Sequence, residues 1–259
     1  MVCPGDYETE LFFKCDPEED SVTLQVGMMA RDGILLVGDV WTYANVSPVR
    51  VAEGGNPVWA GESVSKMTTT KDGDIAISWA QDIAQAQLVA DAIARGLTSQ
   101  YWENPERRIE QIAAAALSSE TLGRGVDCLV ALRGPTFSLF KLVCRKDPGK
   151  EKNVFHCLRA NGQIFAGDCH NPATFWATRY LHVDPEQNPT VDELLPLAVQ
   201  IVADAWQISR GNIRGLEIIR GDAEGFHRLP VKQCKAWAAE AARRSHDIEK
   251  IVMAPLSPQ

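Results

Sequence analysis

The chain has 259 residues, of which 45% are hydrophobic and 23% are charged, and its formal net charge is −8. This length and composition are enough to bury the core of one large domain. The acidic balance argues against nucleic acid binding, which needs a concentrated positive surface. No segment approaches the roughly 20 apolar residues of a membrane span, and the acidic N-terminus lacks the order of a secretory signal. We therefore expect a cytoplasmic protein that binds neither nucleic acid nor membrane.

The first elements in the chain form a hairpin. Residues 21–29 alternate between apolar and polar or small side chains, the period-two pattern of a strand with one buried face. Arg31-Asp32-Gly33 supplies turn chemistry, and the apolar run at 34–37 then ends in Gly38-Asp39. A buried strand that ends on a carboxylate makes Asp39 a candidate functional residue.

The rest of the chain sorts into blocks of strands and helices. A capping box at Thr190 and Glu193 opens one of the helices. In chain order we expect a loop at 41–62, a strand at 74–79, helices at 82–97 and 107–117, strands at 127–133, 137–143, 154–158 and 163–166, helices at 174–181 and 191–208, a strand at 216–219 and a helix at 231–251. This order is typical of two sheets buried between two helical layers.

The seven cysteines are scattered and include no CxxC pair, which is typical of reduced thiols. His156-Cys157 and Cys169-His170 offer four soft ligands. Because neighbours on a strand point to opposite faces, each pair could give at most one ligand to a shared site. His170 is also badly placed to act as the base for Cys169. We expect no metal and no cofactor.

Four motifs resemble, in the same order, those of the proteasome-type subunit family, which comprises 20S proteasome β-like subunits and bacterial proteasome-related N-terminal nucleophile hydrolases. They are SVTLQVGMMARDGILLVGD, SKMTTTKDGDIAISWAQDIAQAQLV, NGQIFAGD and TVDELLPLAVQIVADAWQISRGNIRGLEIIRGDAEGFHRL, which together cover most of residues 21–229. The resemblance implies an α/β (α+β) fold, a four-layer αββα sandwich. It also implies a single domain over residues 21–259, preceded by an extension or propeptide-like segment at residues 1–20.

The chemistry that this resemblance implies is threonine-type hydrolysis of peptide or amide bonds. Thr23 falls at the nucleophile, Asp39 at the aspartate and Lys66 at the lysine of the family's site. The α-amine of a processed N-terminal threonine titrates near 7.7–8.0 and can act as the base. A backbone N–H near Ser78 or Trp79 would stabilise the oxyanion. The expected partners are a peptide or protein substrate and further copies of the chain in a ring, which we expect to meet through the helices at 82–97 and 191–208.

Other residues depart from the family pattern. Val22 stands where active members carry the glycine before the threonine, and Gln207, Arg210 and His170 replace an aspartate and two serines. Activity would require removal of the residues before Thr23. An alternative is a catalytically silent subunit that acts in assembly or binding. In that case Thr23 is an ordinary strand residue, Asp39 a strand cap and Lys66 a solvated side chain.

Overall fold

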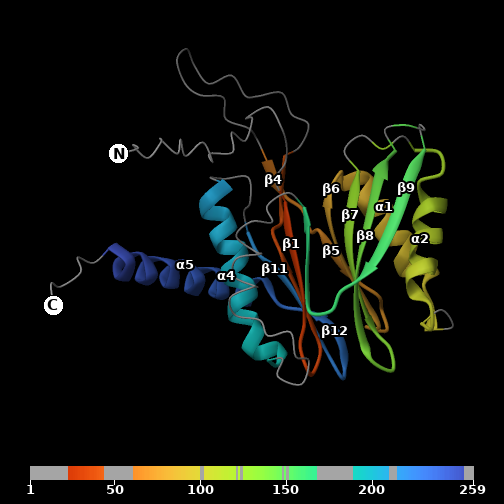
Figure 1. The fold of residues 1–259 in the computed structure, drawn as a ribbon. Helices are drawn as coiled ribbons and strands as arrows, with labels where there is room; N and C mark the ends of the chain where they lie inside the picture. Colours follow the sequence, from red (N-terminus) through yellow and green to blue (C-terminus); the bar gives the residue numbers. More distant parts are fainter. Residues whose placement is uncertain are drawn as a thin grey trace, which may run out of the picture.

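The computed structural model describes residues 23–43, 61–99, 102–120, 122, 125–147, 149, 152–167, 189–209 and 215–253. These residues form a mixed α+β structure with two five-stranded antiparallel sheets, a pair of short strands and four helices (Figure 1). The expected mixed class with two sheets is confirmed.

The first sheet has the strand order β10-β1-β2-β11-β12. Its core is the predicted hairpin, in which Gln25 pairs with Gly38 and the turn closes through a 2.8 Å hydrogen bond from Ala30 N to Gly33 O. The strands are β1 (Leu24–Met29), β2 (Ile34–Gly38), β10 (Gln163–Gly167), β11 (Glu217–Asp222) and β12 (Gly225–Arg228).

The second sheet follows chain order throughout, β5-β6-β7-β8-β9. Short turns join β5 to β6 and β7 to β8, whereas two helices lie between β6 and β7 in the chain. The strands are β5 (Met67–Thr69), β6 (Ile75–Gln81), β7 (Val126–Arg133), β8 (Phe137–Lys146) and β9 (Asn153–Arg159). The separate pair is β3 (Trp41–Tyr43) with β4 (Gly61–Ser63).

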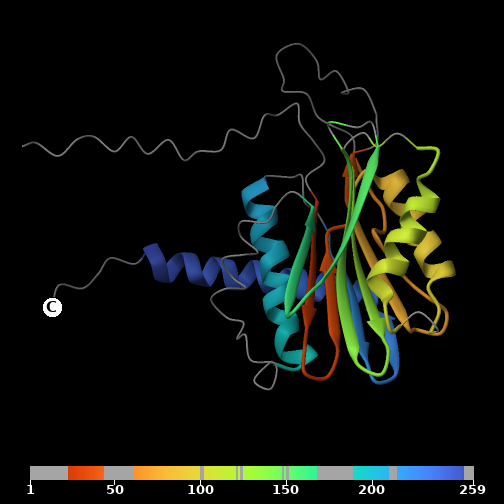
Figure 2. The ribbon, with the colours of Figure 1, turned by 45° about the vertical axis from the view of Figure 1, so that its right-hand side comes forward.

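Helices cover each sheet on the side away from the other sheet (Figures 1 and 2). α1 (Ile83–Gly96) and α2 (Pro105–Ala116) pack on the second sheet, and α4 (Val191–Ser209) packs on β1 and β2 of the first. α5 (Val231–Met253) contacts α4 and β11, and its C-terminal half extends beyond the sheets. The predicted capping box is present, since Thr190 N donates to Glu193 Oε2 at 2.8 Å and Glu193 N donates to Thr190 Oγ1 at 3.2 Å.

The prediction that β1 has one buried face was wrong. Leu24 and Val26 pack toward α4, but Gln25 on the opposite face is also fully buried. The reason is a separate apolar layer between the sheets, which contains Leu36 of β2 and Leu129 of β7. A sheet placed between a helix and a second sheet has no face left for water.

Several other expectations need correction. The segment at 41–62, expected to be a loop, begins and ends in the short strands β3 and β4, and β5 and β12 were not expected at all. Strands of three or four residues carry too little periodicity to be recognised alone.

The expected helix at 174–181 and the extension at 1–20 lie outside the described residues. None of the helices in the described part of the chain is long and apolar enough to cross a membrane.

Candidate active site

The structure brings Thr23, Asp39 and Lys66 together. Lys66 Nζ lies 3.0 Å from Thr23 Oγ1 and 2.8 Å from Asp39 Oδ2. Thr23 directly precedes β1, Asp39 directly follows β2, and Lys66 directly precedes β5. The site therefore sits where one end of the first sheet meets one end of the second.

The β1–β2 hairpin fixes the distance between Thr23 and Asp39. Its pairing continues just beyond the strand ends, where Asp39 N donates to Leu24 O at 3.3 Å. The Asp39 side chain turns back into the same pair, since Oδ1 accepts from Leu24 N at 3.1 Å. One carboxylate oxygen therefore anchors Asp39 to the strand, and the other faces Lys66.

Lys66 reaches this pair from the opposite sheet. Its carbonyl accepts a 3.0 Å hydrogen bond from Trp79 N, which extends the β5–β6 pairing by one residue. The Trp79 N–H is therefore already engaged in the sheet and is not free to stabilise an oxyanion. Ser78 lies within β6 and is paired with both Met67 and Leu129.

Burial makes the electrostatics of the three side chains strong. Thr23 is 2% exposed, Asp39 0% and Lys66 1%. Removing two charges from water is costly, so a buried ion pair persists only where its geometry and extra hydrogen bonds are good. An ammonium has three donors and no acceptor. Lys66 can therefore donate to Asp39 and Thr23 together, which leaves the Thr23 hydroxyl proton free to be given elsewhere.

Gly167 allows the site to close around Thr23. A Cβ at this position would lie 1.9 Å from the Thr23 carbonyl oxygen, and the residue has φ +98°, which favours glycine. Gly167 ends β10, whose register with β1 pairs it with Leu24. The predicted NGQIFAGD motif thus contributes a close backbone approach at Thr23.

Glu217 is a buried acid beside this site, and it was not predicted from the sequence. Its carboxylate contacts Ser65, the backbone of Lys66 and Arg228. Burial raises the pKa of the Glu217 carboxyl, while Arg228, the Ser65 hydroxyl and the Lys66 N–H act in the opposite direction. The only signal in the sequence is a carboxylate directly before the apolar pair Ile218-Ile219.

The other residues that the sequence singled out lie away from the Thr23–Asp39–Lys66 cluster or outside the residues that the structure describes. Cys157 lies in β9, and burial raises the pKa of its thiol to about 12, so it is protonated at neutral pH. Cys169, His170 and Arg210 lie outside the described residues, and only the backbone of Gln207 is described, within α4.

One group among the described residues could place three ligand atoms around a metal ion. These atoms of Asp222, Glu224 and His227 lie within 4.8 Å of one another on the β11–β12 hairpin. Asp222 already accepts from Glu224 N at 2.9 Å and lies 3.5 Å from Arg220 Nε. The Asp222 carboxylate is thus engaged within the protein, and we do not propose a metal site here.

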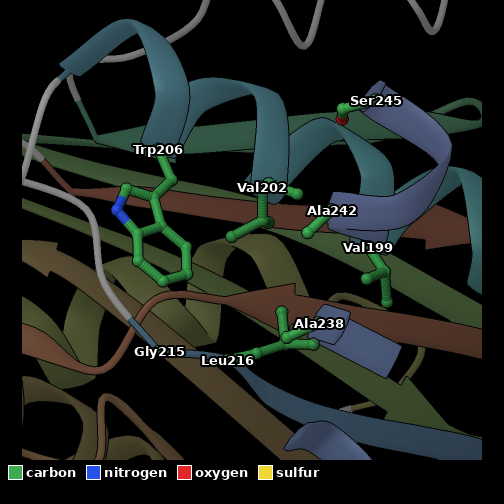
Figure 3. A pocket seen from close by; sticks show the side chains of 9 residues that line it. Val199, Val202, Trp206, Gly215, Leu216, Ala238, Ala242 and Ser245 are labelled. Atoms are coloured by element: carbon green, nitrogen blue, oxygen red, sulfur yellow. The ribbon is translucent and has the colours of Figure 1, made fainter. Parts of the chain in front are cut away.

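A small hollow of about 110 Å³ lies between α4 and α5 (Figure 3). It is several times smaller than the roughly 300–1,000 Å³ of typical small-molecule sites. No acid, base or thiol is among its lining residues, which are Val199, Val202, Ala203, Trp206, Gly215, Leu216, Ala238, Ala242 and Ser245. The hollow therefore offers no competing catalytic site.

The fold resembles that of solved structures of Anbu proteins. One similar solved structure is the helical assembly of the Anbu complex from Pseudomonas aeruginosa, with a TM-score of 0.62 and 12% identity over 92% of this chain and 98% of that chain. Another is a mutant Anbu from Hyphomicrobium sp. strain MC1, with a TM-score of 0.57 and 13% identity over 92% of this chain and 100% of that chain. No protein-family model and no curated protein matches the sequence.

These findings correct the assignment to the proteasome-type subunit family that the sequence motifs implied. The similar structures are Anbu proteins, and identities of 12% and 13% show a shared fold only. The four motifs consist mainly of strand alternation, turn residues and helix caps. Such patterns specify the order of elements, and many subfamilies of one fold share that order.

Proposed function

We propose that this chain is a threonine-type N-terminal nucleophile hydrolase that cleaves amide bonds in peptides or proteins, with Thr23 as the nucleophile once the preceding residues are removed. The observation that carries the proposal is the 3.0 Å contact between Lys66 Nζ and Thr23 Oγ1, with Asp39 Oδ2 2.8 Å from the same nitrogen. Asp39 holds the Lys66 ammonium, and this ammonium faces Thr23 Oγ1, the oxygen that would attack the substrate.

The chemistry follows from this arrangement. The α-amine of a mature Thr23 accepts the hydroxyl proton, and Oγ1 attacks the substrate carbonyl carbon. Lys66 stabilises the negative charge that develops on Oγ1. The tetrahedral species then collapses to an ester on Thr23, and the leaving amine takes up the proton. Water, activated by the same α-amine, hydrolyses the ester and restores the hydroxyl.

Removal of the residues before Thr23 is essential to this mechanism for two reasons. In the sequence as printed the Thr23 nitrogen is part of the peptide bond to Val22, and an amide nitrogen cannot accept a proton near pH 7. Thr23 is also only 2% exposed in the full-length chain, and we propose that removing these residues opens access to its hydroxyl for a substrate carbonyl.

The same observations favour a second candidate, a catalytically silent subunit that acts in assembly or binding. If Val22 stays attached, the Thr23–Asp39–Lys66 cluster remains a buried polar link between the two sheets. The N-terminal residue of the purified protein separates the two candidates, because only the hydrolase must begin at Thr23.

The packing supports two finer parts of this proposal. Helices outside two facing sheets correspond to the four-layer αββα sandwich, which we assign to residues 21–259 as one domain.

We also propose a homo-oligomer, because one of the similar structures is a helical assembly. The inner apolar faces of α1 and α4 are buried in the subunit itself, so association must use outer positions, where Leu88 and Trp206 are 40% and 43% exposed.

The test combines intact mass with turnover of fluorogenic peptides. The proteins compared are the full-length chain, a form that begins at Thr23, and that form with Thr23→Ala. We expect the full-length chain to be inactive and the form beginning at Thr23 to gain about 10²–10⁴-fold from its general base. Hydrolysis by the uncleaved full-length chain, or hydrolysis by the form beginning at Thr23 at a rate that Thr23→Ala leaves unchanged, would exclude the assignment.

A further inference from the structure

Glu217 makes a set of contacts that converge on the segment carrying Lys66. Glu217 Oε1 accepts from Ser65 Oγ at 2.9 Å, and Oε2 accepts from Lys66 N at 3.2 Å. Glu217 Oε1 also forms a 2.7 Å ion pair with Arg228 Nη1. The carboxylate is therefore held from one side by Arg228 and holds the Lys66 backbone on the other.

Arg228 contacts the same segment on the C-terminal side of Lys66. Its second terminal nitrogen donates to the carbonyl of Met67, the residue after Lys66. The Glu217–Arg228 ion pair thus binds three consecutive residues. It contacts the Ser65 hydroxyl, the Lys66 N–H and the Met67 carbonyl. We call Glu217 and Arg228 the Glu217–Arg228 clamp.

The clamp crosses between the two sheets. Glu217 begins β11 and Arg228 ends β12 in the first sheet, which also carries Thr23, whereas Lys66 belongs to the β5 edge of the second sheet. Glu217 is paired with Gly38, next to Asp39. The clamp therefore ties Lys66 to the same strands that position Thr23 and Asp39.

We propose that Glu217 and Arg228 are positioning residues for the reaction, which hold the Lys66 ammonium against the Thr23 hydroxyl by fixing the backbone of residues 65–67. The inference rests on the proposed function for its catalytic consequence. The lysine side chain is long and flexible, so its 3.0 Å contact with Thr23 depends on where its backbone is held. A displacement of about 1 Å at a reacting group can cost about 10²-fold in rate.

The first experiment measures the position of Lys66 without requiring activity. Full-length wild type, Glu217→Ala, Glu217→Gln and the control Glu224→Ala are pulse-labelled with acetic anhydride, and each lysine is read by peptide mass spectrometry. Glu224 is an exposed acid in the turn of the same β11–β12 hairpin, away from residues 65–67. Lys141, whose side chain is 17% exposed and paired with Asp127, serves as an internal reference.

We expect Glu217→Ala to raise labelling of Lys66 at least tenfold, Glu217→Gln to raise it less, and Glu224→Ala to leave it unchanged, with Lys141 constant throughout. An equal rise at Lys66 and Lys141 would mean general loosening and would overturn the positioning role. Unchanged labelling of Lys66 in Glu217→Ala would overturn it as well.

The second experiment measures peptide turnover in whichever form of the wild-type protein is active. Glu217→Ala should lower kcat by about 10²-fold while KM stays within about threefold, because the clamp contacts Lys66 and not the substrate. Turnover in wild type with kcat unchanged in Glu217→Ala rejects the positioning role and keeps the proposed function. Labelling that changes as expected, with no turnover in any form, rejects the proposed function and keeps the clamp as a device that positions Lys66.

Discussion

Lys66 and Thr23 lie 43 residues apart in the sequence and next to the ends of strands in different sheets, yet Lys66 Nζ is 3.0 Å from Thr23 Oγ1. The contact is made inside the protein, where both side chains are at most 2% exposed. A charge at that distance from a hydroxyl acts most strongly when water is excluded. The proposed reaction therefore depends on a relationship that exists only once the two sheets have packed together.

The first prediction concerns Lys66 in the form that begins at Thr23, for which we propose peptide cleavage. Lys66→Met should lower turnover by about 10²–10³-fold, the typical loss when a donor aimed at developing charge is removed. Lys71→Met is the matched control, because Lys71 is exposed in the turn after β5. Steady-state kinetics of both variants decide the matter, and equal rates for Lys66→Met and wild type would contradict the proposed role.

The second prediction concerns the stability of the Asp39–Lys66 ion pair, which lies at 2.8 Å with exposures of 0% and 1%. Replacing one partner leaves an uncompensated buried charge, so Asp39→Leu or Lys66→Met alone should each cost about 3–5 kcal/mol in the free energy of unfolding. The double variant should recover most of that loss. Urea denaturation of all four proteins measures the cycle, and losses that simply add would show that the two residues do not interact.

The third prediction concerns Gly167 beside Thr23. Gly167→Ala forces a Cβ to within 1.9 Å of the Thr23 carbonyl oxygen at φ +98°, so the backbone around Thr23 must shift. We expect a loss of more than about 2 kcal/mol in the free energy of unfolding. The control is Gly149→Ala, where the nearest atom would be the Asp147 carboxylate at 3.5 Å. Thermal unfolding of both variants should show a lowered Tm for Gly167→Ala alone.

The fourth prediction concerns the buried thiols. Burial raises the pKa of Cys144 and Cys157 to about 12, so at pH 8 only about one molecule in ten thousand carries the reactive thiolate at either position. Iodoacetamide should therefore leave both cysteines unmodified in native protein and alkylate them in 8 M urea. Mass spectrometry of the two peptides makes the comparison, and rapid alkylation of native Cys157 would contradict the burial of its side chain beneath α2.

The fifth prediction concerns pH and two glutamates with opposite behaviour. Burial raises the pKa of Glu217 above 4.5, so the native state binds that proton more tightly than the unfolded state does. Its contribution to stability is thus present below pH 4.5 and is lost as pH rises through the folded pKa. Hydrogen bonds from Thr190 lower the pKa of Glu193, so its contribution is present above pH 4.5 and is lost as pH falls.

Stability measured from pH 3 to pH 7 for wild type, Glu217→Gln and Glu193→Gln tests this difference. The stability of wild type relative to Glu217→Gln should fall as pH rises, and its stability relative to Glu193→Gln should rise. Two difference curves with the same slope would show that Glu217 is not desolvated as the structure has it.

Local patterns in the sequence were sufficient for most of the regular elements. The strand β1, the turn at residues 31–33 and the capping box at Thr190 and Glu193 depend on neighbours within a few residues, and all three are present. The spacing within the hairpin also brought Thr23 and Asp39 to one end of the sheet. These features are local, because the contacts that satisfy them are made within one turn or one hairpin.

Packing between the sheets decided the rest. β5 and β12 are too short to show a period, and they become strands because β6 and β11 offer partners for their backbone groups. Gln25 is buried because the second sheet covers β1. Glu217 and Arg228 acquire their role only where β11, β12 and β5 meet. These contacts join residues as far as 161 positions apart, and no pattern in a single stretch of sequence encodes such a distance.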